Sequence, residues 1–67
     1  MIIDRRKLEL QQARASLSRE ELMQAANITV GAWNGLGIRN TTPKTVGKLA
    51  AALGCDVLDI IADRKED

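Results

Sequence analysis

The residues of this chain with the clearest chemistry are cations and hydrogen-bonding side chains between positions 19 and 44. Arg19, Arg39 and Lys44 carry positive charge, while Thr29 and Asn34 offer hydroxyl and amide groups. Guanidinium and ammonium groups bind phosphate oxygens. Amide side chains can bond to the edges of bases. Side chains of these types are able to contact a polyanion.

The charge is unevenly distributed along the chain. The net charge is only +1, but it is +4 over residues 1–48 and −3 over residues 49–67. A basic front and an acidic end would orient the molecule toward a polyanion. Ordinary solvated surface charge explains the same pattern, and on this feature alone it is the better explanation.

Catalytic chemistry has little support in the sequence. Glu20 and Glu21 are adjacent, and adjacent helical residues do not face one another, so we interpret them as helix-cap residues. The glycines of GAWNGLG lack the Lys-Ser/Thr pair of a phosphate-binding loop. One cysteine and no histidine cannot supply the four ligands of a structural zinc site. We expect no enzyme activity, no metal, no cofactor and no small-molecule ligand.

The length of 67 residues indicates one domain, residues 1–67, of marginal stability on its own. The lone Cys55 favours a reducing compartment, and a buried apolar role suits it better than a redox role. The chain has neither a run of about 20 apolar residues nor a signal-peptide core at its start. These features predict a cytoplasmic protein without membrane association.

The first half of the chain has the pattern of two helices. A helix from about Asp4 to Ala15, capped by Asp4, would turn Leu10, Ala13 and Leu17 to the core and Arg5, Arg6, Glu9 and Gln12 to water. Ser18 then starts a second helix, in which Glu21 completes a capping box. We expect Asn27 to end that helix in the left-handed conformation, with inward side chains at Leu22, Ala25 and Ala26.

The stretch TVGAWNGLG predicts a third, glycine-rich helix. Thr29 serves as its cap, Ile28 fills the core beside it, and Ala32, Trp33 and Leu36 share one face by the 3.6-residue period. Gly31 and Gly35 then fall on the opposite face, which is left nearly bare. Trp33 could stack on nucleic acid, but its place beside Leu36 favours burial in the core.

Two further helices are expected before the end of the chain. Thr42-Pro43 starts the fourth and Gly54 ends it, with Val46, Leu49, Ala50 and Leu53 inward. Asp56 caps a fifth helix, VLDIIAD, and the final DRKED is expected to fray. The fifth helix has four apolar side chains, which cannot all point inward: Val57, Leu58, Ile60 and Ile61. The outward ones either contact a second copy of the chain or cover the N-terminal MII, which could itself be a short edge strand.

In this order the segments resemble the Cro/C1-type (XRE) family of helix-turn-helix regulators. The string LSREELMQAANITVGAWNGLG carries the cap, turn and recognition-helix positions, and TVGKLAAALGCDVLDII is similar to the fourth and fifth helices. The resemblance covers about residues 5–62 and looks like the small single-domain subclass. It implies an all-α, five-helix, lambda repressor-like domain with the helix-turn-helix at about residues 18–36. It also implies a repressor that binds a palindromic operator in double-stranded DNA as a homodimer.

The resemblance assigns DNA contacts residue by residue. It places Arg19 on phosphate, the third helix on base edges and the following loop on phosphate. The family often has Gln, Arg, Ser or Asn where this chain has Val30, Gly31 and Gly35, so base reading is left mainly to Thr29, Val30 and Asn34. The contacts that it implies are Arg19, Thr29, Val30, Gly31, Asn34, Gly35, Arg39, Asn40, Thr42 and Lys44.

One departure from the family concerns an ion pair. In most members an arginine of the first helix pairs with a glutamate just after the recognition helix, but the matching positions are Gln12 and Gly37. The alternative function is a protein-interaction module, antitoxin-like or a co-regulator subunit, with weak DNA binding. A contiguous cationic face around Arg19 and Lys44 would favour DNA over that alternative.

Overall fold

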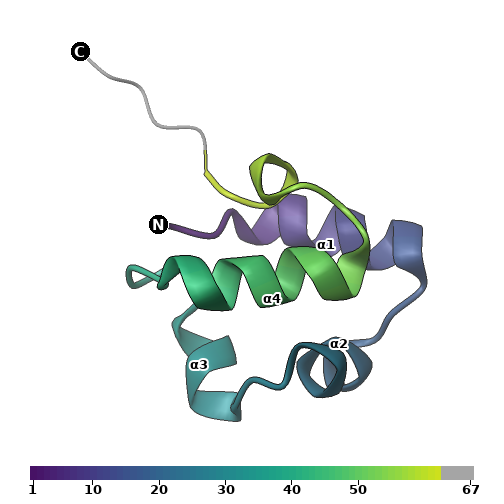
Figure 1. The fold of residues 1–67 in the computed structure, drawn as a ribbon, viewed down its shortest axis with the longest axis horizontal. Helices are drawn as coiled ribbons and strands as arrows, with labels where there is room; N and C mark the ends of the chain where they lie inside the picture. Colours follow the sequence, from purple (N-terminus) through teal and green to yellow (C-terminus); the bar gives the residue numbers. More distant parts are fainter. Residues whose placement is uncertain (63–67) are drawn as a thin grey trace.

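A computed structural model gives the structure of residues 1–62, an all-helical arrangement (Figure 1). Within that range the chain forms four α-helices, one 3-10 helix and no strand longer than an isolated bridge. The expected all-α class is confirmed. The expected fraying of DRKED lies outside the described residues. The elements are α1 (Arg5–Ala15), α2 (Arg19–Ala26), α3 (Val30–Gly35), α4 (Pro43–Leu53) and η1 (Val57–Asp59).

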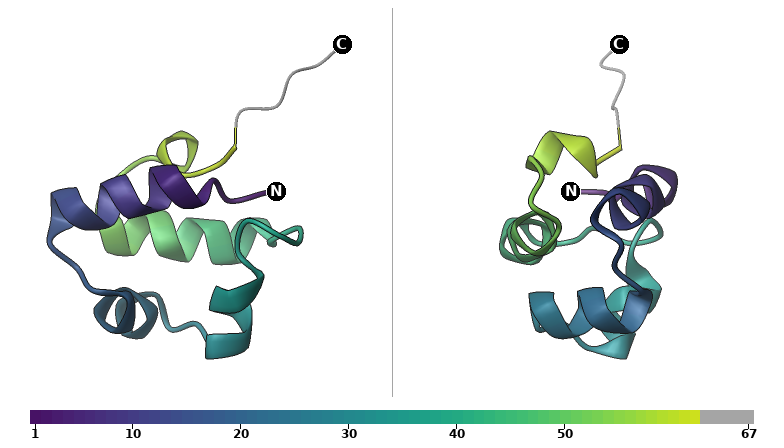
Figure 2. Two further views of the ribbon diagram at one scale, coloured as in Figure 1. Left: turned by 180° about the vertical axis from the view of Figure 1, so that it is seen from behind. Right: turned by 90° about the vertical axis from the view of Figure 1, so that its right-hand side faces the viewer.

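The helices separate into two groups around α4. Helices α1 and α4 lie side by side with η1 above them, and α2 and α3 lie beneath α4 (Figures 1 and 2). The N-terminal residues pass between the end of α3 and the segment after η1, because Asp4 N donates to Ile60 O at 2.8 Å and Thr41 N donates to Met1 O at 2.6 Å. No helix within residues 1–62 has the length and apolar character to cross a bilayer.

Each α-helix begins at a side chain that accepts a backbone hydrogen bond. Asp4 accepts from Arg6 N at 2.9 Å, and Ser18 and Glu21 form the complete capping box. Thr29 accepts from Ala32 N and Thr42 from Thr45 N, at 3.1 and 3.3 Å. These bonds satisfy N–H groups that have no partner within the helix. The caps expected for these four helices are confirmed.

All four α-helices contribute buried side chains to the core, but α1 contributes differently from the expectation. Leu8 is its one buried residue, whereas Leu10 is 62% exposed and Ala13 is also exposed. The inward side of α1 continues through half-buried glutamines, and Gln12 donates to Leu17 O at 3.4 Å. The apolar pattern therefore predicts the wrong inward face for α1, because polar side chains occupy part of the face that packs on the core.

The inward faces of the later helices are confirmed in part. All four expected residues of α4 are buried: Val46, Leu49, Ala50 and Leu53. Leu22 and Ala26 of α2 are buried as well, but Ala25 and Ala32, also expected to face inward, are exposed. In helices of eight and six residues the buried stripe is narrow. A small alanine beside the stripe loses little by facing water.

The expected fifth helix is wrong beyond its first turn. The chain forms only the 3-10 turn η1, in which Asp56 N donates to Asp59 Oδ2 at 3.0 Å. It then extends, and Ile61 forms an antiparallel bridge with Ile3. Ile60 is fully buried while Leu58 is 69% exposed. The alternative that this segment covers the N-terminal MII is therefore confirmed for Ile60 and Ile61.

We predict opposite effects from two substitutions at left-handed helix ends. Gly54 follows α4 at φ +69°, and a Cβ there would meet only Arg14 Nη2 at 3.9 Å, so Gly54→Ala isolates the conformational cost. Ser16 follows α1 at φ +58° and already bears that cost. Gly54→Ala should lower, and Ser16→Gly should raise, the free energy of unfolding by about 0.5–1 kcal/mol. Urea unfolding followed by Trp33 fluorescence measures both, and equal signs would contradict the prediction.

Candidate nucleic-acid interface

Helices α2 and α3 are joined by a turn of residues 27–29. Asn27 takes the left-handed conformation at φ +56°, as expected, and reverses the chain after α2. Ile28 is half-buried against the core, and its N–H donates to Met23 O at 3.0 Å. Thr29 then caps α3. The turn thus fixes where α3 starts relative to α2.

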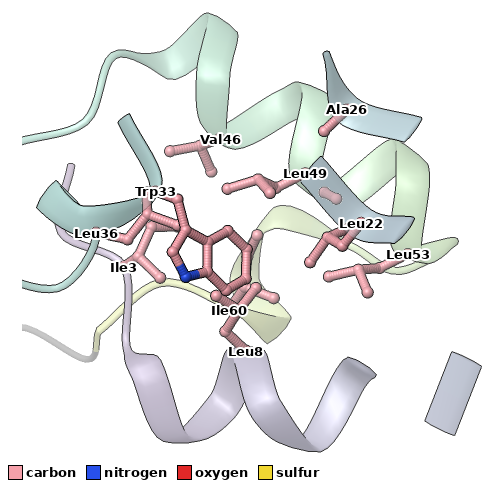
Figure 3. Packing of buried hydrophobic residues seen from close by; sticks show 11 residues of the cluster. Ile3, Leu8, Leu22, Ala26, Trp33, Leu36, Val46, Leu49, Leu53 and Ile60 are labelled. Carbon is pink, nitrogen blue, oxygen red and sulfur yellow. The ribbon is translucent and has the colours of Figure 1, made fainter. Parts of the chain in front are cut away.

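The inner face of α3 is anchored by its two large apolar side chains. Trp33 is 6% exposed and Leu36, just after the helix, is 1% exposed. The indole lies in the middle of the buried cluster, near Leu8 of α1 and Leu49 of α4 (Figure 3). The expected core role of Trp33 is confirmed. A helix of only six residues has little stability of its own, so these contacts hold it in place.

Arg5 adds a second anchor at the C-terminal end of α3. Its Nε donates to Leu36 O at 2.8 Å and its Nη2 donates to Trp33 O at 2.7 Å. The guanidinium carbon also lies 5.3 Å from the centre of the Trp33 ring, in cation–π contact. A cation is favourable beside the carbonyl end of a helix. Arg5 is exposed, as expected, but it also holds the end of α3, a role that was not expected.

Gly37 makes room for this arginine. Its φ is +82°, and a Cβ at that position would lie 2.8 Å from Arg5 Cγ. Gly37 is thus paired with Arg5, from the first turn of α1. This role of Arg5 could not be predicted from the sequence, because its acceptors are backbone carbonyls, which leave no signal in residue types.

A groove of about 460 Å³ opens beside the outer face of α3, between that helix, the 39–42 loop and the first turn of α4. Six of the ten expected DNA contacts line it: Thr29, Gly31, Gly35, Arg39, Asn40 and Thr42. Ala32, Thr41 and Thr45 line it too and were not expected. The spacing Thr42-x-x-Thr45 was an available signal, since residues three apart share a helix face. The two hydroxyl oxygens are 3.1 Å apart.

The remaining four expected contacts are exposed but do not line the groove: Arg19, Val30, Asn34 and Lys44. Arg19 Nη2 forms an ion pair with Glu20 Oε2 at 3.1 Å, between side chains that are 58% and 73% exposed. A hydrogen bond from its own backbone N–H and the Arg19 charge hold the pKa of Glu20 below its usual value. Such exposed pairs contribute little stability, so Arg19 can exchange Glu20 for another anion.

The two glycines of α3 differ in their surroundings. A Cβ on Gly31 would meet only Thr29 Oγ1, at 3.9 Å, so this position opens to solvent as expected. Gly35 is buried instead, because the Arg39 side chain covers it. A Cβ on Gly35 would lie 3.2 Å from Arg39 Nε and 3.2 Å from Nη2. The outer face of α3 is therefore bare at Gly31 and occupied by a guanidinium at Gly35.

We predict that Arg5→Ala destabilises the protein and changes the environment of Trp33. Two hydrogen bonds from a charged donor and one cation–π contact are lost, so unfolding should become easier by about 1–3 kcal/mol. The emission of Trp33, the single tryptophan, should shift in the folded state. Arg6→Ala is the control, because the Arg6 side chain forms no hydrogen bond or ion pair with residues 1–62. This substitution should change the free energy of unfolding by no more than about 0.5 kcal/mol.

A double-substitution cycle tests whether Arg5 and Gly37 act together. Gly37→Ala alone should be destabilising, because it places an atom against Arg5 Cγ and strains φ. In the Arg5→Ala background the steric part of that cost disappears. The losses of unfolding free energy in the two single variants should therefore add up to more than the loss in the double variant. Full additivity would show that Gly37 does not serve Arg5.

Comparison of the chain with protein-family models, curated proteins and solved structures gives no significant match. The described residues themselves form an all-helical chain in which α2 and α3 are joined by a short turn. Beside α3 lies a groove lined by threonines, one asparagine and one arginine. These side chains combine hydrogen-bond donors with positive charge.

Proposed function

We propose that the protein is a sequence-specific DNA-binding transcriptional regulator, a repressor of the Cro/C1-type helix-turn-helix class. In this proposal the fold is the lambda repressor-like one, with η1 in the place of the fifth helix. The observation that carries the proposal is the groove. It joins the outer face of α3 to four hydroxyl groups and the Arg39 guanidinium, the kinds of group that bind phosphate and base edges.

The groove is suited to a phosphate backbone by the state of its hydroxyl groups. Thr29 Oγ1 already accepts a hydrogen bond from Ala32 N, which leaves its O–H free to donate. Thr42 and Thr45 share one bond between their hydroxyls, so that pair also keeps a donor. Phosphate oxygens accept only, and donors held in fixed positions by helix caps suit them.

Positive charge near the groove supports the same ligand. Lys44 lies in the first turn of α4, two residues after the groove residue Thr42. The side chains of Lys44 and Arg39 have no ion-pair or hydrogen-bond partner between residues 1 and 62. In the proposed complex α3 enters the major groove, Lys44 and Arg19 neutralise flanking phosphates, and the threonines fix the register.

The proposal includes a homodimer on a palindromic operator. Two-fold symmetry would match half-sites about one helical turn apart. Of the four apolar residues at 57–61 expected near a dimer contact, Leu58 is the outward one at 69% exposure, while Ile60 is buried in its own chain. We therefore assign the contact to Leu58, with Val57 and Ile61 half-buried beside it.

A protein-interaction module is the second candidate, and exposed apolar side chains favour it. Ile38 is 78% exposed and Leu10 is 62% exposed. A dimer contact at Leu58 does not account for these two exposed apolar side chains. In that case these side chains would bind another protein, and the chain would bind DNA only weakly and without preference over the scrambled duplex. The binding experiment below separates the two candidates.

We predict salt-dependent binding to a labelled duplex taken from the DNA upstream of the protein's own gene. Lys44→Ala and Arg19→Ala should each weaken binding and reduce the slope of log K against log salt by about one unit, since each removes one phosphate contact. Fluorescence anisotropy at several salt concentrations, with a scrambled duplex as competitor, gives both quantities.

Arg6→Ala is the charge-matched control for this experiment. Arg6 belongs to the first turn of α1 and does not line the groove. Its loss should leave the salt slope unchanged. Absence of binding at low salt, or equal slopes for all three variants, would contradict the proposed DNA contact.

A further prediction concerns the bare position of α3. Gly31→Gln should keep the fold, because a Cβ there meets only Thr29 Oγ1 at an ordinary distance. The new amide would face the DNA and should raise the preference for adenine at one position of each half-site, since glutamine bonds to adenine N6 and N7. Circular dichroism checks the fold and selection from a randomised duplex library checks the preference. Unfolding would show that Gly31 is packed.

A further inference from the structure

The outer face of α3 lacks the side chains that usually read bases. Val30 and Gly31 have no polar side-chain atoms, and Gly35 lies under another residue. Asn34 is the one amide on the helix. Recognition of guanine in the major groove requires two donors in a fork, which Arg provides best. Such a fork lies at Gly35, supplied by Arg39.

Arg39 is bonded to α3 through its backbone, and its side chain lies over Gly35. Its backbone N–H donates to Gly35 O at 2.9 Å, and the neighbouring Ile38 N donates to the same carbonyl at 3.1 Å. The turn after α3 thereby folds back, and the guanidinium reaches the missing side chain of Gly35, with Nε, Nη2 and Cζ 3.2–3.3 Å from the site of a Cβ. It therefore occupies the place of a long side chain on α3.

The guanidinium of Arg39 differs from those of Arg5, Arg14 and Arg19 in the part of the chain that the structure describes. Arg5 bonds to two carbonyls, Arg14 to Gln11 and Leu53, and Arg19 to Glu20. Between residues 1 and 62 the Arg39 guanidinium forms no hydrogen bond and no ion pair. It nevertheless lines the groove beside α3. Its N–H groups are thus available to a ligand in the groove.

We propose that Arg39 is the base-reading side chain of this protein and binds guanine O6 and N7 from its position over Gly35. This inference rests on the proposed DNA binding and assigns the loop residue a different role from the phosphate contact that the family resemblance implies. Gly35 is required for this arrangement, because a side chain there would displace the Arg39 guanidinium. The operator then has a G·C pair opposite Gly35 in each half-site.

The test begins with selection from a randomised double-stranded DNA library, using wild type, Arg39→Ala and Arg39→Lys. Wild type should prefer guanine at one position of each half-site by about 5- to 150-fold. Arg39→Ala should lose that preference. Arg39→Lys keeps the charge but not the fork, so it should keep the salt slope while the preference falls.

Two matched changes separate base reading from phosphate binding. On the protein, Gly35→Ala should reduce the guanine preference without changing the salt slope, whereas Lys44→Ala should do the reverse. On the DNA, 7-deazaguanine at the selected position removes the N7 acceptor. It should weaken wild-type binding severalfold and leave Arg39→Ala unaffected, which ties the lost contact to this one arginine.

The outcomes distinguish the inference from the function on which it rests. If Arg39→Ala keeps the base preference and lowers the salt slope by about one unit, Arg39 contacts phosphate; the inference is then overturned and DNA binding stands. If wild type binds no duplex at low salt, both are overturned. Circular dichroism on each variant shows that loss of preference is not loss of fold.

Discussion

The attachment of α3 to α1 through Arg5 is the interaction on which the rest of the candidate interface depends. Helix α3 has six residues and two of them are glycines, each of which costs about 1 kcal/mol relative to alanine in a helix interior. It cannot persist by its own hydrogen bonds. Arg5 bonds to the carbonyls of Trp33 and Leu36, while the indole of Trp33 inserts into the core below. Together they fix the helix that forms one wall of the groove.

The glycine-rich stretch around α3 is explained by three different constraints. Gly37 needs its positive φ and its missing Cβ to let Arg5 pass. Gly35 leaves the space that the Arg39 guanidinium occupies. Gly31 has open space around it, and nothing in the structure requires glycine there. Arg5 therefore holds the end of α3 from one side and Arg39 lies over its outer face, and Gly37 and Gly35 leave the space for them.

Local signals explain the parts of the fold that could be predicted from the sequence. The caps at Ser18 and Thr42 and the helix end at Gly54 depend on neighbouring residues only, and the prediction of each was correct. Helix α4 was also predicted correctly, because its apolar period is unbroken. Six of the ten residues expected to contact DNA line the groove, because its lining comes from consecutive segments of the chain, α3, the loop and the start of α4.

The parts that could not be predicted depend on contacts between distant residues. The fifth helix gives way to an extended segment because Ile61 pairs with Ile3, far away in the sequence. The inward face of α1 was predicted wrongly from Leu10, because the face that packs on the core includes half-buried glutamines. The roles of Arg5 and Arg39 are determined by backbone carbonyls and by an absent side chain. Residue types alone carry no record of such partners.

The N-terminal residues join the two halves of the molecule that the proposed function uses. Asp4 N donates to Ile60 O and Ala62 N donates to Ile2 O, which ties these residues to the segment after η1. On the other side, Thr41 N donates to Met1 O, which ties them to the groove loop. Because Arg5 follows directly and holds α3, one short segment positions the loop, the helix and the Leu58 region together. In a chain of 67 residues with a small core, such a shared tie gives the interface a fixed geometry that no single helix contact would provide.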